Sequence, residues 1–141
     1  MSGTRPNAIA KRPRLPYLLV SFSFLLLALA SKGYTGSCHQ FVNHYLGDLF
    51  IVGCLYFLLL LCFPNLSPLT LAALVLAVSV SVESAQAHVV PILQRLPHWI
   101  RFWTGTTFDP LDILAYCAGI ALAASTHLLL KRGAEGQVPA A

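Results

Sequence analysis

The sequence predicts an all-helical protein, an integral membrane four-helix bundle, and three observations lead to this prediction. Of the 141 residues, 57% are hydrophobic and 10% are Asp, Glu, Lys or Arg, whereas soluble domains contain about 25% charged residues. The chain contains four apolar runs, each nearly or fully long enough to cross a bilayer as a helix. Most of the basic residues lie outside these runs, near the two ends of the chain.

The apolar runs divide the chain into one membrane domain and two tails. Residues 1–14 are polar and basic, and we expect a disordered cytoplasmic tail there. The membrane domain is predicted to cover residues 15–130, and residues 131–141 form a second, polar cytoplasmic tail. The four predicted spans are residues 15–30, 46–63, 69–87 and 111–130, with a tight turn at residues 64–68 and longer connections at residues 31–45 and 88–108.

The first apolar run, from Leu15 to Ala30, is short for a span and has two interpretations. A basic stretch before it and the small residues Ala28 and Ala30 at its end are typical of a cleavable signal peptide. The chain that follows is itself apolar enough to enter the membrane, and it needs no secretion signal. We therefore expect the first run to be retained as a helix, with cleavage as the alternative.

The distribution of basic residues predicts the orientation in the membrane. With the N-terminus in the cytoplasm, the cytoplasmic segments hold six Lys and Arg residues, and the outer connections hold only Lys32, Arg95 and Arg101. In membrane proteins the cytoplasmic segments carry the excess of Lys and Arg. We therefore expect both termini to be cytoplasmic, as four spans require.

Glu83 is an ionisable residue inside the third apolar run, and Gln86 follows three residues later on the same helix face. A carboxylate at the centre of a bilayer costs on the order of 2–3 kcal/mol, and such residues usually have a function. Glu83 is therefore a candidate general acid or base, or a proton carrier, and Gln86 is a candidate ligand-binding residue. The alternative is a structural carboxylate that is hydrogen-bonded to Gln86, to a serine or to Arg101.

Two further carboxylates stand at the beginning of apolar runs. Asp48 lies at the start of the second span and Asp112 at the start of the fourth. Both are candidate catalytic residues beside Glu83, because the predicted orientation places all three near the outer face. Each also has a structural interpretation, since acids in the first turn of a helix interact with its free N–H groups. Asp109, which precedes Pro110, has the pattern of a helix N-cap.

Small residues predict how the third and fourth helices pack. They recur at every fourth position in both helices, and such ridges let membrane helices approach closely. We expect the two ridges to meet, which would turn Glu83 away from the fourth helix and toward Asp48. The ridges consist of Ala73, Ala77, Ser81 and Ala85 on the third helix and of Ala115, Gly119 and Ala123 on the fourth.

The connection between the third and fourth spans contains an amphipathic segment, residues 92–103, which is interrupted by Pro97. Its apolar residues, two tryptophans among them, recur at helical spacing. We expect this segment to lie in the membrane interface, where tryptophans anchor proteins. The alternative to plain anchoring is a lid over the polar residues, in which Arg101 binds an anionic head group.

The sequence argues against several other classes of protein. The four cysteines form no C-x-x-C pair, which argues against a structural zinc site or a redox motif. His39, His44 and Asp48 have no established metal-ligand spacing, so we predict no metal and no cofactor. The basic residues are not interleaved with aromatics on a polar surface, so nucleic acid is not an expected partner. No Ser-His-Asp motif, P-loop or dinucleotide fingerprint occurs.

Several of these residues occur in an order that resembles a known family. They are Tyr45–Asp48, Val82–Gln86, Arg101 and Phe108–Ile120, and they resemble the small bacterial inner-membrane proteins of the domain-of-unknown-function family DUF two-eight-zero-nine. The resemblance runs from about the first span to the end of the fourth. It implies an all-helical protein of the bacterial inner membrane with a retained first span.

The resemblance implies no specific reaction, because the family has none established. The family is distantly similar to VanZ-like proteins, which are associated with low-level resistance to glycopeptide antibiotics of the teicoplanin type. Between Arg101 and Phe108 this chain is shorter and less glycine-rich than we expect for the family. The resemblance therefore applies to the helices rather than to this loop.

The leading hypothesis is a non-enzymatic protein of the bacterial cell envelope. One alternative is a membrane-embedded enzyme that acts on a lipid head group, with Glu83 as acid or base. Another is a proton-coupled carrier, which would need to form a homo-oligomer because four short helices leave little room for a path. The lipid bilayer is the expected partner in every case. In the leading hypothesis an outer-face cluster stabilises the bundle or binds an amphiphilic or lipid-linked ligand, and it consists of Asp48, Glu83, Gln86, Arg101 and Asp112.

Overall fold

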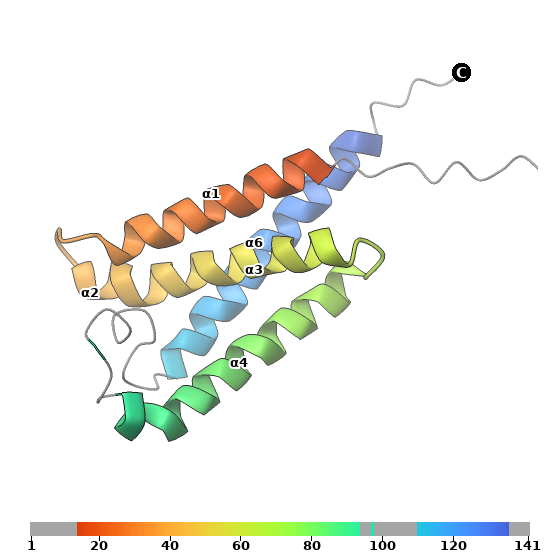
Figure 1. The fold of residues 1–141 in the computed structure, drawn as a ribbon. Coiled ribbons are helices and arrows are strands. Elements are labelled where there is room, and N and C mark those ends of the chain that lie inside the picture. Colours follow the sequence, from red (N-terminus) through yellow and green to blue (C-terminus); the bar gives the residue numbers. More distant parts are fainter. Residues whose placement is uncertain (1–13, 94–96, 98–109, 136–141) are drawn as a thin grey trace, which may run out of the picture.

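The computed structural model describes residues 14–93, 97 and 110–135, and these form a helical bundle (Figure 1). The described residues contain no strand, which confirms the predicted all-helical class. Two short elements, α2 (His39–Phe41) and the π-helix η1 (Val42–Leu46), precede the second long helix. The four long helices are α1 (Arg14–Lys32), α3 (Gly47–Cys62), α4 (Pro68–Leu93) and α6 (Pro110–Glu135).

Helix α3 is the centre of the bundle. It packs against α1, α4 and α6, and α4 packs against α6 as well. Figure 1 shows that the beginning of α1 and the end of α6 lie at the same end of the bundle. The opposite end carries α2, η1 and the beginning of α6. This arrangement follows because the chain runs along the bundle an even number of times, once in each of the four long helices.

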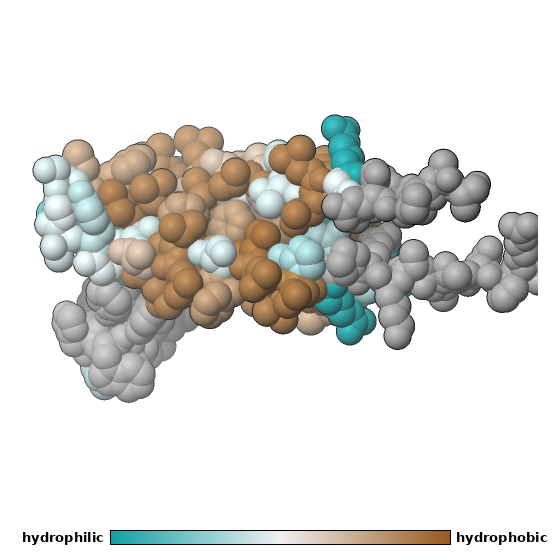
Figure 2. All heavy atoms as spheres, turned by 90° about the horizontal axis from the view of Figure 1, so that it is seen from above, coloured by the Kyte–Doolittle hydropathy of each residue, from teal (hydrophilic) through white to brown (hydrophobic). Residues whose placement is uncertain are grey.

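The four long helices are suited to a membrane. Each contains a stretch that is long and apolar enough to cross a bilayer, which makes the chain a membrane protein with several spans. In Figure 2 hydrophobic side chains cover the middle of the visible face, and hydrophilic residues gather toward its two ends. Large apolar side chains such as Leu18, Phe22 and Leu129 are exposed on the surface of the bundle, where lipid would cover them.

The second span begins earlier than the sequence predicts. Residues 31–45 are expected to be a polar connection, but the chain is continuously helical from His39 through η1 and α3 to Cys62. Cys38, with a left-handed φ of 60°, precedes this helix. The expectation is wrong because the polar residues His39, Gln40, Asn43 and His44 belong to the same helix as the apolar residues that follow them. Inside a membrane a continuous helix satisfies the backbone hydrogen bonds that a loop would leave open.

The predicted turn between the second and third spans is confirmed, and local chemistry explains it. The Ser67 hydroxyl accepts a hydrogen bond from the backbone N–H of Thr70 (3.1 Å), which caps the start of α4. Pro68 occupies the first position of α4, where its missing N–H costs nothing. At the other end, α4 continues to Leu93. The rest of the predicted interfacial segment lies outside the described residues.

Aromatic rings dominate the contact between α1 and α3. Phe24 of α1 lies 6.0 Å from Phe57 of α3, measured between ring centroids. Gly53 makes room for Phe24, because a Cβ atom at residue 53 would lie 2.5 Å from that ring. The remaining core comes from all four long helices and includes Tyr17, Val52, Tyr56, Leu60, Leu71, Val75, Tyr116, Ile120 and Ala123.

The predicted contact between two small-residue ridges is wrong. All four ridge residues of α4, from Ala73 to Ala85, are exposed. The side of α4 that faces the bundle instead carries Leu71, Val75, Ser79 and Glu83, which are buried. A carboxylate directed into lipid is costly, so the rotation of α4 that buries Glu83 also turns the small residues outward.

The small ridge of α6 is buried, but it packs against α3. At Gly119 a Cβ atom would collide with the backbone carbonyl of Leu49 in α3. Ala115 and Ala123, one turn away on either side, are also buried. Close approach of the two backbones therefore depends on the missing side chain of Gly119.

We expect the substitution Gly119→Ala to destabilise the bundle by about 1–3 kcal/mol, because the added methyl group must push α6 away from α3. The measurement is the free energy of unfolding in lipid–detergent micelles, followed by circular dichroism during titration with SDS. Gly133→Ala is the matched control, since a Cβ at residue 133 meets no atom within 4 Å. Equal stability of the two variants would contradict the close α3–α6 contact.

Candidate functional site

Glu83 is buried between α4 and α6 and accepts a hydrogen bond from Tyr116. The distance from the Tyr116 hydroxyl to Glu83 Oε2 is 2.8 Å, and the two residues are 6% and 7% exposed. The prediction that Glu83 faces away from the fourth helix is therefore wrong. Ser79, one turn earlier on α4, is buried on the same side of the helix.

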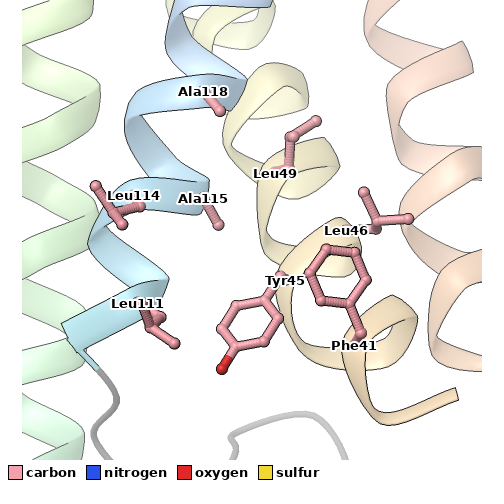
Figure 3. A pocket seen from close by; sticks show the side chains of 8 residues that line it. All are labelled: Phe41, Tyr45, Leu46, Leu49, Leu111, Leu114, Ala115 and Ala118. Atoms are coloured by element: carbon pink, nitrogen blue, oxygen red, sulfur yellow. The ribbon is translucent and has the colours of Figure 1, made fainter. Parts of the chain in front are cut away.

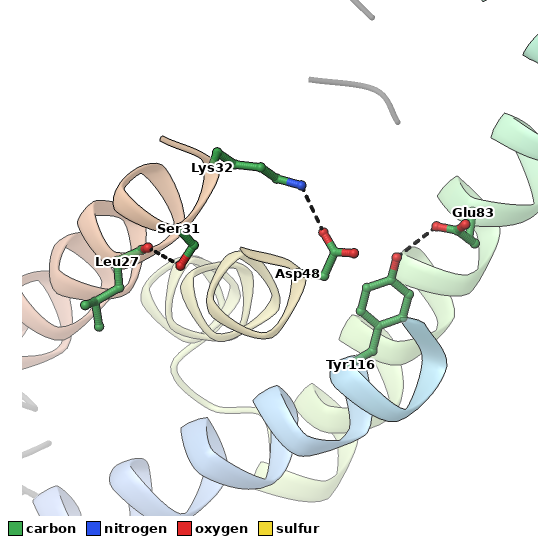
Figure 4. A network of polar contacts seen from close by, with 6 residues as sticks. All are labelled: Leu27, Ser31, Lys32, Asp48, Glu83 and Tyr116. Carbon is green, nitrogen blue, oxygen red and sulfur yellow. Dashed lines mark hydrogen bonds and ion pairs between the residues drawn. The ribbon is translucent and has the colours of Figure 1, made fainter. Parts of the chain in front are cut away.

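Asp48 lies between this pair and the end of α1 (Figure 4). Its Oδ1 is 3.7 Å from the Nζ of Lys32, and both side chains are about three-quarters buried, with 23% and 27% exposed. The expected proximity of Asp48 to Glu83 is present, since the two carboxylates are close enough to interact electrostatically. Gly47 contributes by its small size, because a Cβ there would lie 3.1 Å from Lys32 Cε.

Asp112 completes the group from the first turn of α6. It is 7% exposed, and it interacts electrostatically with the Tyr116 hydroxyl, as Asp48 and Glu83 do. Three carboxylates, from α3, α4 and α6, thus act electrostatically on one tyrosine. We call this group the polar cluster, and it consists of Lys32, Asp48, Glu83, Asp112 and Tyr116.

Other predicted site residues lie outside what the structure describes. Gln86 belongs to α4, one turn after Glu83, but its side chain is not among those described. Arg101 and Asp109 fall in the segment between α4 and α6 that is not described. Lys32 and Tyr116 are the additions to the predicted cluster. Tyr116 follows Asp112 by one helical turn, which is the signal that points to it, whereas no sequence pattern points to Lys32.

An apolar groove lies beside the polar cluster, between η1, α3 and α6 (Figure 3). Its volume is about 280 Å³. Leu49 and Ala115 in the groove belong to the same helical turns as Asp48 and Tyr116. Successive residues of a helix point about 100° apart, so the groove and the cluster occupy neighbouring faces of α3 and α6. The lining residues are Phe41, Tyr45, Leu46, Leu49, Leu111, Leu114, Ala115 and Ala118.

A second buried polar contact lies in the opposite half of the bundle. The hydroxyl of Tyr56 in α3 is 3.1 Å from Nδ1 of His127 in α6, and these residues are 0% and 2% exposed. The ring of Tyr17 in α1 meets the His127 ring edge-on, with 5.6 Å between centroids. Eleven residues separate His127 from Tyr116, which is about 16 Å along a helix. Sequence reasoning missed this contact, although a lone histidine in an apolar run is a signal for it.

The described side chains can bind protons and cations, and the Tyr116–Glu83 pair can exchange a proton. Carboxylates bind protons and cations, and the groove offers an apolar surface. Among the described residues, no group of three or more His, Cys, Asp or Glu side chains is arranged to hold a metal ion. Cys54 is buried and hydrogen-bonds with Ser21, at a distance of 3.5 Å between Sγ and Oγ. Beside the groove, among the described residues, the Tyr116 hydroxyl is paired with the Glu83 carboxylate.

Comparison with known proteins identifies a family but no function. The sequence profile of a family described as "Protein of unknown function (DUF2809)" matches residues 37–120. The matched range contains η1, α3, α4, the first turns of α6 and every polar-cluster residue except Lys32. It is shorter than the resemblance suggests, because α1 and the second half of α6 lie outside it. No curated protein and no solved structure matches the chain.

We expect Tyr116→Phe to lower the free energy of unfolding by about 1–2 kcal/mol, because Glu83 loses a hydrogen-bond donor in an apolar environment. The measurement is the same SDS titration, carried out for Tyr116→Phe, Glu83→Gln and the double variant. The decreases in unfolding free energy of the two single variants should not be additive, because each variant removes the same Glu83–Tyr116 interaction. Tyr34→Phe is the control, because Tyr34 is 42% exposed. Strict additivity would show that the 2.8 Å contact contributes nothing.

Proposed function

We propose that this chain, which belongs to the DUF2809 family, binds an amphiphilic or lipid-linked ligand at the outer end of its membrane bundle. The observation that carries the proposal is the position of the apolar groove beside the polar cluster, on the same turns of α3 and α6. An amphiphile needs both surfaces, one for its hydrocarbon part and one for its head group. Ligand sites in helical bundles typically combine an apolar lining with a few polar groups.

The proposed cellular setting is the cytoplasmic membrane of a bacterium, with both termini in the cytoplasm. The excess of basic residues near the two ends of the chain supports this orientation. Residues 1–14 and 131–141 would then be cytoplasmic tails around the membrane domain. We also propose a role in the cell envelope, as the resemblance of the sequence to VanZ-like proteins implies.

The polar cluster would also stabilise the bundle. Its two direct contacts, Lys32–Asp48 and Glu83–Tyr116, join α1 to α3 and α4 to α6. Buried polar contacts between membrane helices are worth about 0.6–2 kcal/mol each. Gln86 and Arg101 are proposed to extend the cluster toward the ligand.

A membrane-embedded enzyme is the second candidate function, favoured by the burial of Glu83. In such an enzyme Glu83 would exchange a proton with a lipid head group. The Tyr116 hydroxyl, 2.8 Å from Glu83 Oε2, would orient the Glu83 carboxylate. Asp48 and Asp112 would be its catalytic neighbours. A lipid profile that is identical in wild-type cells and in cells with Glu83→Gln would exclude this candidate.

We expect Cys38 to react from outside the cell and Cys62 to be protected, because these exposed cysteines lie at opposite ends of the bundle. Each is studied as the single remaining cysteine in otherwise cysteine-free protein. Intact cells are treated with a membrane-impermeant maleimide, and permeabilised cells serve as the control for reactivity. Labelling of Cys62 alone in intact cells would reverse the proposed orientation.

We expect Ala118→Phe to abolish most ligand binding, because the new ring would fill the groove. The probe is dodecanol with a photoactivatable diazirine in its chain, added to the protein in phosphatidylcholine nanodiscs, and labelled peptides are located by mass spectrometry. Ala121→Phe is the matched control, since Ala121 is an exposed residue of the same helix outside the groove lining. Equal labelling of residues 41–49 in both variants would contradict a site in the groove.

A further inference from the structure

We infer that the ligand of the groove is a lipid of the bilayer itself, which inserts one hydrocarbon chain sideways between α3 and α6. This inference rests on the proposed function, and it names the class of ligand at the same groove. The observation that carries it is the continuity of the groove with the exposed apolar surface of the bundle, which lipid covers. Phe41, Leu111 and Leu114 line the groove, and each is more than half exposed.

The groove belongs to the spanning part of the chain. All of its lining residues lie within His39–Cys62 and Leu111–Gly133, two of the stretches that are long and apolar enough to cross a bilayer. A lipid therefore reaches the groove without passing through water. Because lipids surround the exposed side of the groove at high local concentration, even a weak preference for it fills the groove by mass action.

Water is a poor occupant of this groove. A buried water molecule needs about two to four polar partners. Among the described lining residues, only Tyr45 has a polar side chain. A hydrocarbon chain, by contrast, gains dispersion contacts with the leucine and aromatic side chains of the lining. The lining therefore favours hydrocarbon over water.

The direction and size of the groove match a single lipid chain. Phe41, Tyr45 and Leu49 recur at four-residue intervals and so follow one side of the second span. On α6 the lining runs from Leu111 to Ala118, which is about 10 Å along the helix axis. The groove thus runs along the two helices, as extended chains do in a bilayer. A volume of about 280 Å³ suits one chain, since it is at the small end of ligand pockets.

The two ends of the groove differ, and this difference orients the lipid. Figure 3 shows Tyr45 and its hydroxyl at the end where α6 begins, and Ala118 at the opposite end. Tyrosines of membrane proteins gather at the interface, where the ring contacts hydrocarbon and the hydroxyl reaches the polar layer. The head group of the lipid would therefore lie at the Tyr45 end, and its second chain would stay in the bilayer.

The test compares two phosphatidylcholine probes that carry a diazirine in one acyl chain, either beside the ester or halfway along the chain. The protein is kept in phosphatidylcholine nanodiscs, and labelled residues are located by mass spectrometry. We expect the first probe to label residues 41–46 and 111, and the second to label residues 49, 115 and 118. Labelling of Leu18 and Phe22, which are exposed on α1, measures ordinary contact with the bilayer.

Variants that fill the groove connect the labelling to the site. Ala118→Phe should reduce labelling of the groove by the mid-chain probe about fivefold relative to labelling of Leu18. Leu114→Trp, one turn earlier on α6, narrows the exposed side of the groove and should reduce this labelling as well. Two variants are used so that misfolding of one does not decide the result. Ala121→Phe should leave both labelling patterns unchanged, since Ala121 is exposed outside the groove lining.

Each other outcome has its own meaning. Labelling of the groove by the dodecanol probe, but not by phosphatidylcholine above the level of Leu18, would overturn the bilayer lipid and leave the proposed site for an amphiphile intact. If Ala118→Phe changes the labelling by neither kind of probe, the proposed function itself is overturned. A disulfide-linked dimer of Leu114→Cys in otherwise cysteine-free protein, with loss of lipid labelling, would assign the groove to a second copy of the chain.

Discussion

The burial of one carboxylate, Glu83, determines how the bundle is assembled. Glu83 is the only Asp, Glu, Lys or Arg in α4, so an outward orientation of its side chain would place a charged group in lipid. Facing inward, Glu83 reaches the Tyr116 hydroxyl, and Val75 and Ser79 are buried with it at four-residue intervals. The same rotation exposes the small residues of α4. Lipid hydrocarbon and apolar side chains are nearly equivalent surroundings for an alanine. Exposing the small residues therefore costs little free energy compared with what is gained by keeping the Glu83 carboxylate out of lipid.

The polar cluster closes only one end of the bundle, and the two ends are held by different chemistry. At the cluster the contacts involve charged groups, Lys32 with Asp48 and Tyr116 with Glu83. In the other half, Tyr56 and His127 form a hydrogen bond within an aromatic environment. The middle of the bundle is stabilised by close packing. Gly53 leaves space for the Phe24 ring, and Gly119 lets the α3 backbone approach α6. The polar end is thus the part of the bundle to which the proposed function is assigned.

Much of the fold could be predicted because hydrophobic length and charge are local properties of the sequence. The four spans and the convergence of Asp48, Glu83 and Asp112 follow from where each acid stands in its helix. The wrong predictions concern rotation and continuity. The spacing of small residues does not predict whether lipid or another helix covers that face of a helix. Gly119 accordingly packs against α3 instead of α4. The groove depends on the π-helix η1, and five residues from Val42 to Leu46 carry no recognisable signature for it.

The cost of burying three acids bears on the proposed function of the polar cluster. Buried ion pairs can often be replaced by well-packed apolar residues with no loss of stability. Apolar side chains at Asp48, Glu83 and Asp112 would join the helices without the cost of removing charge from water. Groove residues such as Ala118, by contrast, are exposed, so their side chains contribute little to the core. Stability alone therefore does not explain why carboxylates are buried next to an open apolar surface, which is the arrangement that the proposed amphiphile would use.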